Sequence, residues 1–103
     1  MAEVTRSEAA ENDIREVLTY TVEGWDVEQA VKYADLIEEA IDAIANNPHV
    51  GRPRFGVRPG ILAHHISQKG RSASHFLYYR IDLNGEVEIV RFLHDRMDPG
   101  LHL

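Results

Sequence analysis

The hydrophobic pattern of this 103-residue chain changes its period near the middle. Up to residue 46, apolar residues recur every three or four positions, and this spacing predicts amphipathic helices. From there on they fall in three short runs, over 61–67, 75–83 and 86–94, which are typical of strands. The length supports one domain, over residues 1–103. The order predicts an α+β fold in which an N-terminal antiparallel helical hairpin packs on one face of a small antiparallel sheet.

Capping residues mark where the two helices begin and end. Ser7 is a good N-cap for the first helix, and Gly24 and Asp26 end it on either side of Trp25. Asp26, with Gln29 three positions later, resembles a capping box for the second helix. Asn-Asn-Pro at 46–48 predicts the end of that helix, with an asparagine in the left-handed C-cap conformation. Its apolar stripe consists of Val27, Ala30, Val31, Ala34, Ile37, Ala40, Ile41 and Ile44.

A β-hairpin is predicted around Asn84-Gly85, a pair that favours a two-residue type I′ turn. Such a turn sets a register in which His75 faces His94 and Arg80 faces Ile89. Residues 2–6 form a possible short edge strand, and the Pro- and Gly-rich residues 48–60 form a surface loop.

The net charge of −6 conceals an uneven distribution along the chain. Residues 1–47 hold 12 acidic and 3 basic side chains, whereas residues 48–103 hold 5 acidic and 8 basic ones and all six histidines. This asymmetry indicates either two surfaces with different partners or simply an acidic, solvated helical face. The absence of cysteine excludes disulfides, thiolate metal sites and cysteine nucleophiles.

No apolar run is long enough to span a membrane, and the N-terminus is too polar for a signal peptide, so we expect a cytoplasmic protein.

Histidines suggest two candidate clusters. His64 and His65 are adjacent on a predicted strand, so they point to opposite faces and cannot chelate one metal ion together. His75 and His94 face each other in the predicted register, where they could bind a metal, act as an acid/base pair or merely stack. No carboxylate with metal-ligand spacing and no hydrolase-type nucleophile accompanies them, so we expect no metal, no cofactor and no catalytic set.

Arginines suggest two more candidate sites. Arg80 and Arg91 lie within apolar strands, where they either pair with helix carboxylates such as Glu11, Glu38 or Asp42, or project beside Tyr78 as a basic, aromatic patch. The sequence GRPRFGVRPG, at 51–60, presents three arginines on a loop whose spacing does not match a phosphate-binding loop. That loop is either merely solvated or a binding element.

The order of several short motifs resembles one family. The motifs are NPHVGRPR, RPG, FLYYR and VRFLHDRMD, and the similarity extends from about Ser7 to Leu103. In this order they resemble the ParE branch of the RelE/ParE superfamily of bacterial toxins. The resemblance implies a helical hairpin on a small antiparallel sheet, and a toxin of a type II toxin–antitoxin system that contributes to plasmid or chromosome maintenance.

The resemblance also implies partners. A ParD-like antitoxin would neutralise the toxin in a hetero-oligomer of 2:2 or higher stoichiometry. The target would be DNA gyrase, through its A subunit, bound as protein to protein and without specific nucleic-acid recognition. We expect the target to contact Arg71, Arg80, Arg91, His94 and Arg96. We expect the antitoxin to contact Tyr20, Trp25, Tyr33, Ile37 and Arg58.

Two alternatives stay open. A RelE-like mRNA endonuclease would use His94 as proton donor or acceptor and Arg80 and Arg91 to stabilise phosphate charge. The net charge of −6 is poorly suited to a phosphate-rich ribosomal site, which favours the gyrase inhibitor, a binder rather than an enzyme. A non-toxic partner that only binds the antitoxin is the third reading.

Overall fold

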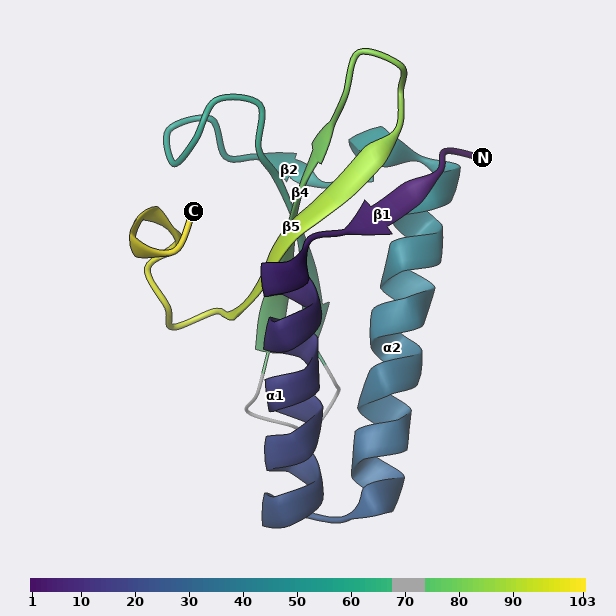
Figure 1. Ribbon diagram of the computed structural model, residues 1–103, viewed down its shortest axis with the longest axis vertical. Helices are drawn as coiled ribbons and strands as arrows, with labels where there is room; N and C mark the ends of the chain where they lie inside the picture. Colours follow the sequence, from purple (N-terminus) through teal and green to yellow (C-terminus); the bar gives the residue numbers. More distant parts are fainter. Residues whose placement is uncertain (68–73) are drawn as a thin grey trace.

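The computed structural model describes residues 1–67 and 74–103 and has two helices packed on a five-stranded sheet (Figure 1). The helices are α1 (Glu8–Gly24) and α2 (Val27–Asn46), which form the predicted hairpin. The main strands are β3 (Leu62–Ser67), β4 (Ser74–Ile81) and β5 (Val87–His94). Short elements complete the fold: β1 (Val4–Arg6), η1 (Pro48–Val50), β2 (Arg52–Pro53) and η2 (Pro99–Leu101).

The sheet is mixed, with strand order β1-β5-β4-β3-β2. The three pairings among β2, β3, β4 and β5 are antiparallel, as predicted, but β1 runs parallel to β5. This one parallel pair arises because the chain enters α1 directly after β1, so β1 joins the sheet without a hairpin turn. The α+β class is confirmed, and the sheet departs from a fully antiparallel arrangement at this edge. At the other edge, β2 pairs with β3 inside the segment 48–60 that was predicted to be a loop.

Both helix N-caps are as predicted. The Ser7 hydroxyl accepts a hydrogen bond from the amide of Ala10 at 3.0 Å and donates one to the carbonyl oxygen of Val90 at 2.7 Å, so it also fastens α1 to β5. The Asp26 carboxylate accepts from the amide of Gln29 at 2.8 Å. At the end of α2, Asn47 has φ −147°, so the predicted left-handed cap is wrong although the helix does stop there. The extended conformation leads directly into Pro48, as residues before proline prefer.

The apolar stripe of α2 was predicted too long. Ile37, Ile41 and Ile44 are buried against the sheet, but Val27 and Val31 are exposed. The reason is that the closed end of the helical hairpin extends beyond the strands, so nothing from the sheet covers it (Figure 1).

The β4–β5 hairpin contains a bulge that the sequence-based register lacks. From His75/His94 to Tyr78/Arg91 the pairing is as predicted, but between Tyr78 and Tyr79 the register shifts by one residue. Arg80 therefore faces Glu88 instead of Ile89. Gly85 has φ +81°, but Asn84, like the other non-glycine residues that the structure describes, has no positive φ, so the turn is not type I′. The amide of Asp82 donates to the carbonyl of Glu86 at 2.8 Å, which closes a three-residue loop over 83–85.

The bulge keeps the buried face apolar. With the shift, Val87 and Ile89 point into the main core together with Leu77, Tyr79 and Phe92. The opposite face carries a smaller cluster of Ile61, Ala63, Tyr78 and Leu93, on which Leu103 packs.

A buried tyrosine anchors the segment after α2. The Tyr79 hydroxyl accepts from the amide of Gly51 at 2.8 Å and donates to the carbonyl of Pro48 at 2.7 Å. A Cβ atom at position 51 would lie 2.5 Å from that hydroxyl oxygen, so only glycine allows the approach. Within the described residues, no helix is long and apolar enough to cross a membrane.

Candidate functional site

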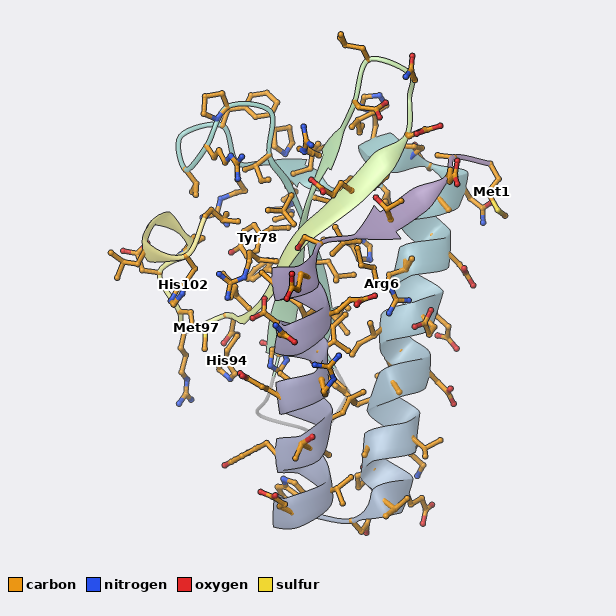
Figure 2. All side chains as sticks on the ribbon, in the orientation of Figure 1. Met1, Arg6, Tyr78, His94, Met97 and His102 are labelled. Carbon is orange, nitrogen blue, oxygen red and sulfur yellow. The ribbon has the colours of Figure 1, made fainter. Side chains whose placement is uncertain are left out.

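A groove of about 1030 Å³ runs along α1, and we call it the α1 groove. One wall is α1, the other is the segment after β5, and the base is formed by β5, β4 and the first turns of α2. His94, Met97 and His102 of the second wall lie on the side of α1 that is turned away from α2 (Figure 2). The lining residues are Asp13, Glu16, Val17, Tyr20, Thr21, Trp25, Gln29, Tyr33, His75, Arg91, Phe92, Leu93, His94, Arg96, Met97 and His102.

A buried polar pair forms the base of the groove. The Tyr33 hydroxyl is hydrogen-bonded to Nδ1 of His75 at 2.6 Å, and the His75 ring stacks on Phe92 with centroids 4.7 Å apart. Burial, helped by the neighbouring His94, lowers the pKa of His75 to about 4, and burial raises the pKa of Tyr33 to about 12. Both groups are therefore neutral at pH 7, and the pair is a rigid floor rather than a source of charge.

The rim beside it is charged. His94 meets His75 edge to face, with centroids 5.1 Å apart, as the predicted pairing of these strands requires. Nδ1 of His94 accepts from the amide of Arg96 at 3.0 Å and lies 3.0 Å from Oδ1 of Asp95, so it ion-pairs with Asp95 only when protonated there. Asp95 accepts a hydrogen bond from the Ser74 hydroxyl, which is the main reason that its pKa is lowered.

A single arginine connects both walls. Nε and Nη2 of Arg91 donate to the carboxylate of Asp13 on α1 at 2.7 and 2.8 Å, and Nη1 donates to the carbonyl of His102 at 3.0 Å. Asp13 also accepts from the amide of Phe92 at 3.0 Å. Arg91 is thus paired with a helix carboxylate, as one of the two alternatives held, although the acid is not among those expected. The hydrogen bonds that Arg91 donates to Asp13 raise the pKa of Arg91 further, so the pair is ionised.

The α1 groove gathers residues that the sequence-based hypothesis assigned to two different partners. Tyr20, Trp25 and Tyr33 were expected to bind the antitoxin, and all three line it. Arg91, His94 and Arg96 were expected to bind the target, and they line it too. Tyr20 and Trp25 are 73% and 65% exposed, which leaves aromatic surface available for contact.

The other expected contact residues lie elsewhere. Ile37 is only 1% exposed and packs in the main core, so it has no surface to offer a partner. Arg58 is exposed on the loop before β3, and Arg80 is ion-paired with Glu88 at 2.8 Å outside the groove. Arg71 falls outside the described residues. The alternative catalytic set of His94, Arg80 and Arg91 is therefore not assembled at one place, because Arg80 does not line the groove and Arg91 is occupied by Asp13.

Four groove residues escaped the sequence reasoning. Asp13 and Gln29 were read only as parts of helices, and Met97 and His102 follow the last strand without any periodic pattern. The Oε1 atom of Gln29 is buried and accepts no hydrogen bond from the part of the chain that the structure describes. The sequence contains one signal for Asp13: it comes directly before the buried Ile14, and a helix side chain at that position can reach a neighbouring strand.

His64 and His65 behave as expected, with the first half-buried and the second exposed. Among residues 1–67 and 74–103, no group of three or more His, Asp or Glu side chains is placed to hold a metal ion.

Comparisons with known proteins agree on one family. Residues 4–99 match the family described as "ParE toxin of type II toxin-antitoxin system, parDE". The chain is 38% identical to Toxin ParE1 of Mycobacterium tuberculosis (strain H37Rv) and 35% identical to Toxin ParE1 of Caulobacter vibrioides. Each alignment spans 97 residues, covering 94% of this chain and 93% of the relative. A solved structure, "Chromosomal ParDE TA system from P. aeruginosa", shares the fold with a TM-score of 0.70 at 19% identity, over 91% of this chain and 96% of that one.

Proposed function

The chain belongs to the ParE toxin family of type II toxin–antitoxin systems, and from this premise we propose that it inhibits DNA gyrase and that a ParD-like antitoxin neutralises it in the α1 groove. The toxin acts by binding the A subunit of gyrase in the bacterial cytoplasm, with no reaction of its own. The two proteins form a hetero-oligomer of 2:2 or higher stoichiometry.

The observation that carries this proposal is the overlap within the groove. Exposed aromatic side chains on α1 and its C-cap lie on one wall, and His94 and Arg96 lie on the other. An antitoxin that fills the groove would therefore cover the surface expected to meet the target, and neutralisation would be direct competition.

The antitoxin segment that suits the α1 groove is an amphipathic helix. Its apolar face would lie on Val17, Tyr20 and Trp25, since exposed Tyr and Trp side chains are the usual anchors of such interfaces. An extended segment would continue along the sheet or its edge.

The target is tested with two parallel assays on the purified toxin. One incubates it with gyrase, ATP and supercoiled plasmid, and the other adds it to a translation extract. We expect linear plasmid and intact mRNA. Cleaved mRNA with intact plasmid would replace the gyrase reading by the endonuclease, and no effect in either assay would leave only an antitoxin-binding role.

The groove is tested by measuring the affinity of the neighbouring-gene antitoxin for two truncations. Trp25→Ala lies in the groove, and we expect it to weaken binding by at least about 30-fold, the effect of a central aromatic anchor. Val31→Ala is the matched control, because this side chain is equally apolar and exposed but lies on α2 outside the groove. Equal affinities of the two variants would rule out the groove as the antitoxin site.

The competition is tested separately. Gyrase A subunit and the antitoxin's C-terminal peptide are added together to immobilised toxin. We expect each to displace the other, and a stable ternary complex would contradict competition. Deleting that C-terminal segment from the antitoxin should abolish tight binding.

A second candidate, the mRNA endonuclease, rests on one observation. His94 is half-buried at the groove rim next to Asp95 and Arg96, where its imidazole would serve as the proton donor or acceptor. His94→Ala tests whether this histidine takes part in toxicity. A variant that remains fully toxic would exclude His94 from both the gyrase and the endonuclease mechanisms.

A further inference from the structure

A stretch in the middle of the chain contains no acidic residue at all. Between Asp42 and Asp82 there is no aspartate or glutamate, although the whole chain has 17 of them. A largely exposed part of this stretch is the segment of residues 52–60, which begins with β2 and leads toward β3; we call it the arginine loop. It carries Arg52, Arg54 and Arg58, together with Phe55, whose side chain is 57% exposed.

The arginines of this loop have no carboxylate partner among the described residues, a property that they share with Arg15 and Arg96. Among the described residues, Arg6, Arg80 and Arg91 each form an ion pair with a carboxylate. The guanidinium groups of Arg52 and Arg58 are exposed and make no ion pair or hydrogen bond with any described residue. The positive charge of Arg54 acts on the Tyr78 hydroxyl, where it opposes the rise in pKa that burial causes. The positive charge of the arginine loop is therefore not neutralised within the described chain.

The arginine loop is held in one conformation by its own backbone. The amide of Arg54 donates to the carbonyl of Ile61 at 2.9 Å, which closes the loop at its base. Inside it, the amides of Val57 and Arg58 both donate to the carbonyl of Arg54, at 2.9 and 3.3 Å. Gly60, with φ +80°, turns the chain back into β3. The charges are thus positioned before any partner arrives, which reduces the entropy lost on binding.

Unpaired guanidinium groups beside an exposed aromatic ring are the chemistry that binds single-stranded nucleic acid. Guanidinium groups pair with successive phosphates, and a flat exposed ring stacks on an unpaired base, whose face is hidden in a duplex. We propose that the arginine loop is a second binding site, separate from the α1 groove, that takes a single strand of nucleic acid without regard to its sequence. None of its residues lines the groove.

The net charge of −6 does not oppose this contact, because the acidic residues are concentrated on the helices. In Figure 1 the arginine loop lies on the opposite side of the molecule from α2, which carries six acidic side chains when its N-cap is included. The expectation of no specific nucleic-acid recognition is also unaffected, since phosphate pairing and stacking carry no sequence information.

The test measures the binding of the full chain to a fluorescent oligothymidylate of about 20 nucleotides by anisotropy at several salt concentrations. Three phosphate contacts predict a slope of log affinity against log salt of about −2, and therefore a loss of about 20-fold between 50 and 200 mM salt. In the double variant Arg52→Gln/Arg58→Gln we expect the slope to fall to about −0.7 and the affinity to drop at least about tenfold. Phe55→Leu should weaken binding about tenfold with the slope unchanged, because it removes stacking but no charge.

The control is the double variant Arg15→Gln/Lys32→Gln, which makes the same change in net charge on α1 and α2. We expect it to bind like the unmodified chain. The proposal is overturned if the unmodified chain shows no salt-dependent binding, or if the control loses as much affinity as the loop variant. It is also overturned if polyglutamate of equal charge displaces the oligonucleotide as well as unlabelled oligothymidylate does, since the loop would then be a site for acidic protein.

Discussion

Replacing Tyr79 by phenylalanine tests the anchor between the sheet and the segment after α2. The substitution removes one oxygen atom from a fully buried side chain and, with it, the hydrogen bonds to the amide of Gly51 and the carbonyl of Pro48. The Gly51 amide is then buried without a partner, a loss that costs about 1–3 kcal/mol, and the Pro48 bond adds about 1 kcal/mol. We expect the free energy of unfolding to fall by about 2–4 kcal/mol, a large part of the 5–15 kcal/mol typical of a domain.

The assay is urea unfolding followed by circular dichroism and by Trp25 fluorescence, whose transitions must coincide for a two-state analysis. The midpoint should fall with an unchanged slope, and the melting temperature should drop by about 10–20 °C. Tyr20→Phe is the matched control: this ring is 73% exposed, so the same atom is removed at almost no cost, within about 0.5 kcal/mol.

Gly51→Ala tests the same contact from the side of Gly51. In Gly51→Ala, the new Cβ would lie 2.5 Å from the Tyr79 hydroxyl oxygen, so this variant should lose at least as much stability as Tyr79→Phe. Because the phenylalanine removes that oxygen, the double variant should be less destabilised than the two singles added together, by about 1 kcal/mol. Additive effects, or a Tyr79→Phe variant as stable as Tyr20→Phe, would refute the role of this anchor.

Three further predictions concern the core, the turn and the groove. The free energy of unfolding should decline by about 3 kcal/mol in all as pH falls from about 6.5 to about 4, because the pKa of His75 is lowered to about 4 in the folded chain and is near 6.5 in the unfolded chain. Urea unfolding at each pH measures this decline, and His75→Asn should flatten it. Gly85→Ala should cost about 1–2 kcal/mol in thermal unfolding because φ is +81°, whereas Gly24→Ala, with equally open space and no positive φ, should be neutral or slightly stabilising; equal effects would contradict the turn conformation. Asp13→Ala should lower the free energy of unfolding by about 3–5 kcal/mol, because it leaves the largely buried guanidinium of Arg91 and the amide of Phe92 unpaired. Arg80→Ala, which breaks an exposed pair, should lower it by less than about 1 kcal/mol; similar losses in chemical denaturation would show that the Arg91–Asp13 pair stabilises no more than a surface pair does.

Local signals predicted most of the fold. Caps such as Ser7 and Asp26 act through hydrogen bonds to residues three positions away, so the sequence alone contains both partners. The bulge in β5 is also visible in the sequence. Val87 and Ile89 are odd-numbered and Phe92 is even-numbered, so a strand without a bulge that buries Phe92 would also bury Glu88. The hairpin prediction failed there because it followed the turn pair and not this break in the alternation.

The candidate site was harder to predict because its geometry depends on distant parts of the chain. Arg91 and Asp13 are 78 positions apart, and the local signal of Asp13, its place just before Ile14, does not identify Arg91 as its partner. Likewise, a sequence can list an aromatic group on a helix and a charged group after a strand, but only packing shows that the two sets share one groove. Ile37 was expected to contact the antitoxin but is buried in the core. Helical spacing alone does not tell which apolar residue of a stripe is buried and which is exposed at its edge.

The separation of acidic helices from the acid-free arginine loop gives the molecule an electric dipole. A charged partner approaching from solution experiences a torque before any contact is made, so a polyanion meets the toxin with the loop foremost and a cationic partner meets it with the helices foremost. The two kinds of encounter therefore begin at different faces of a domain of only 103 residues, and salt slows both by shortening the range of the field.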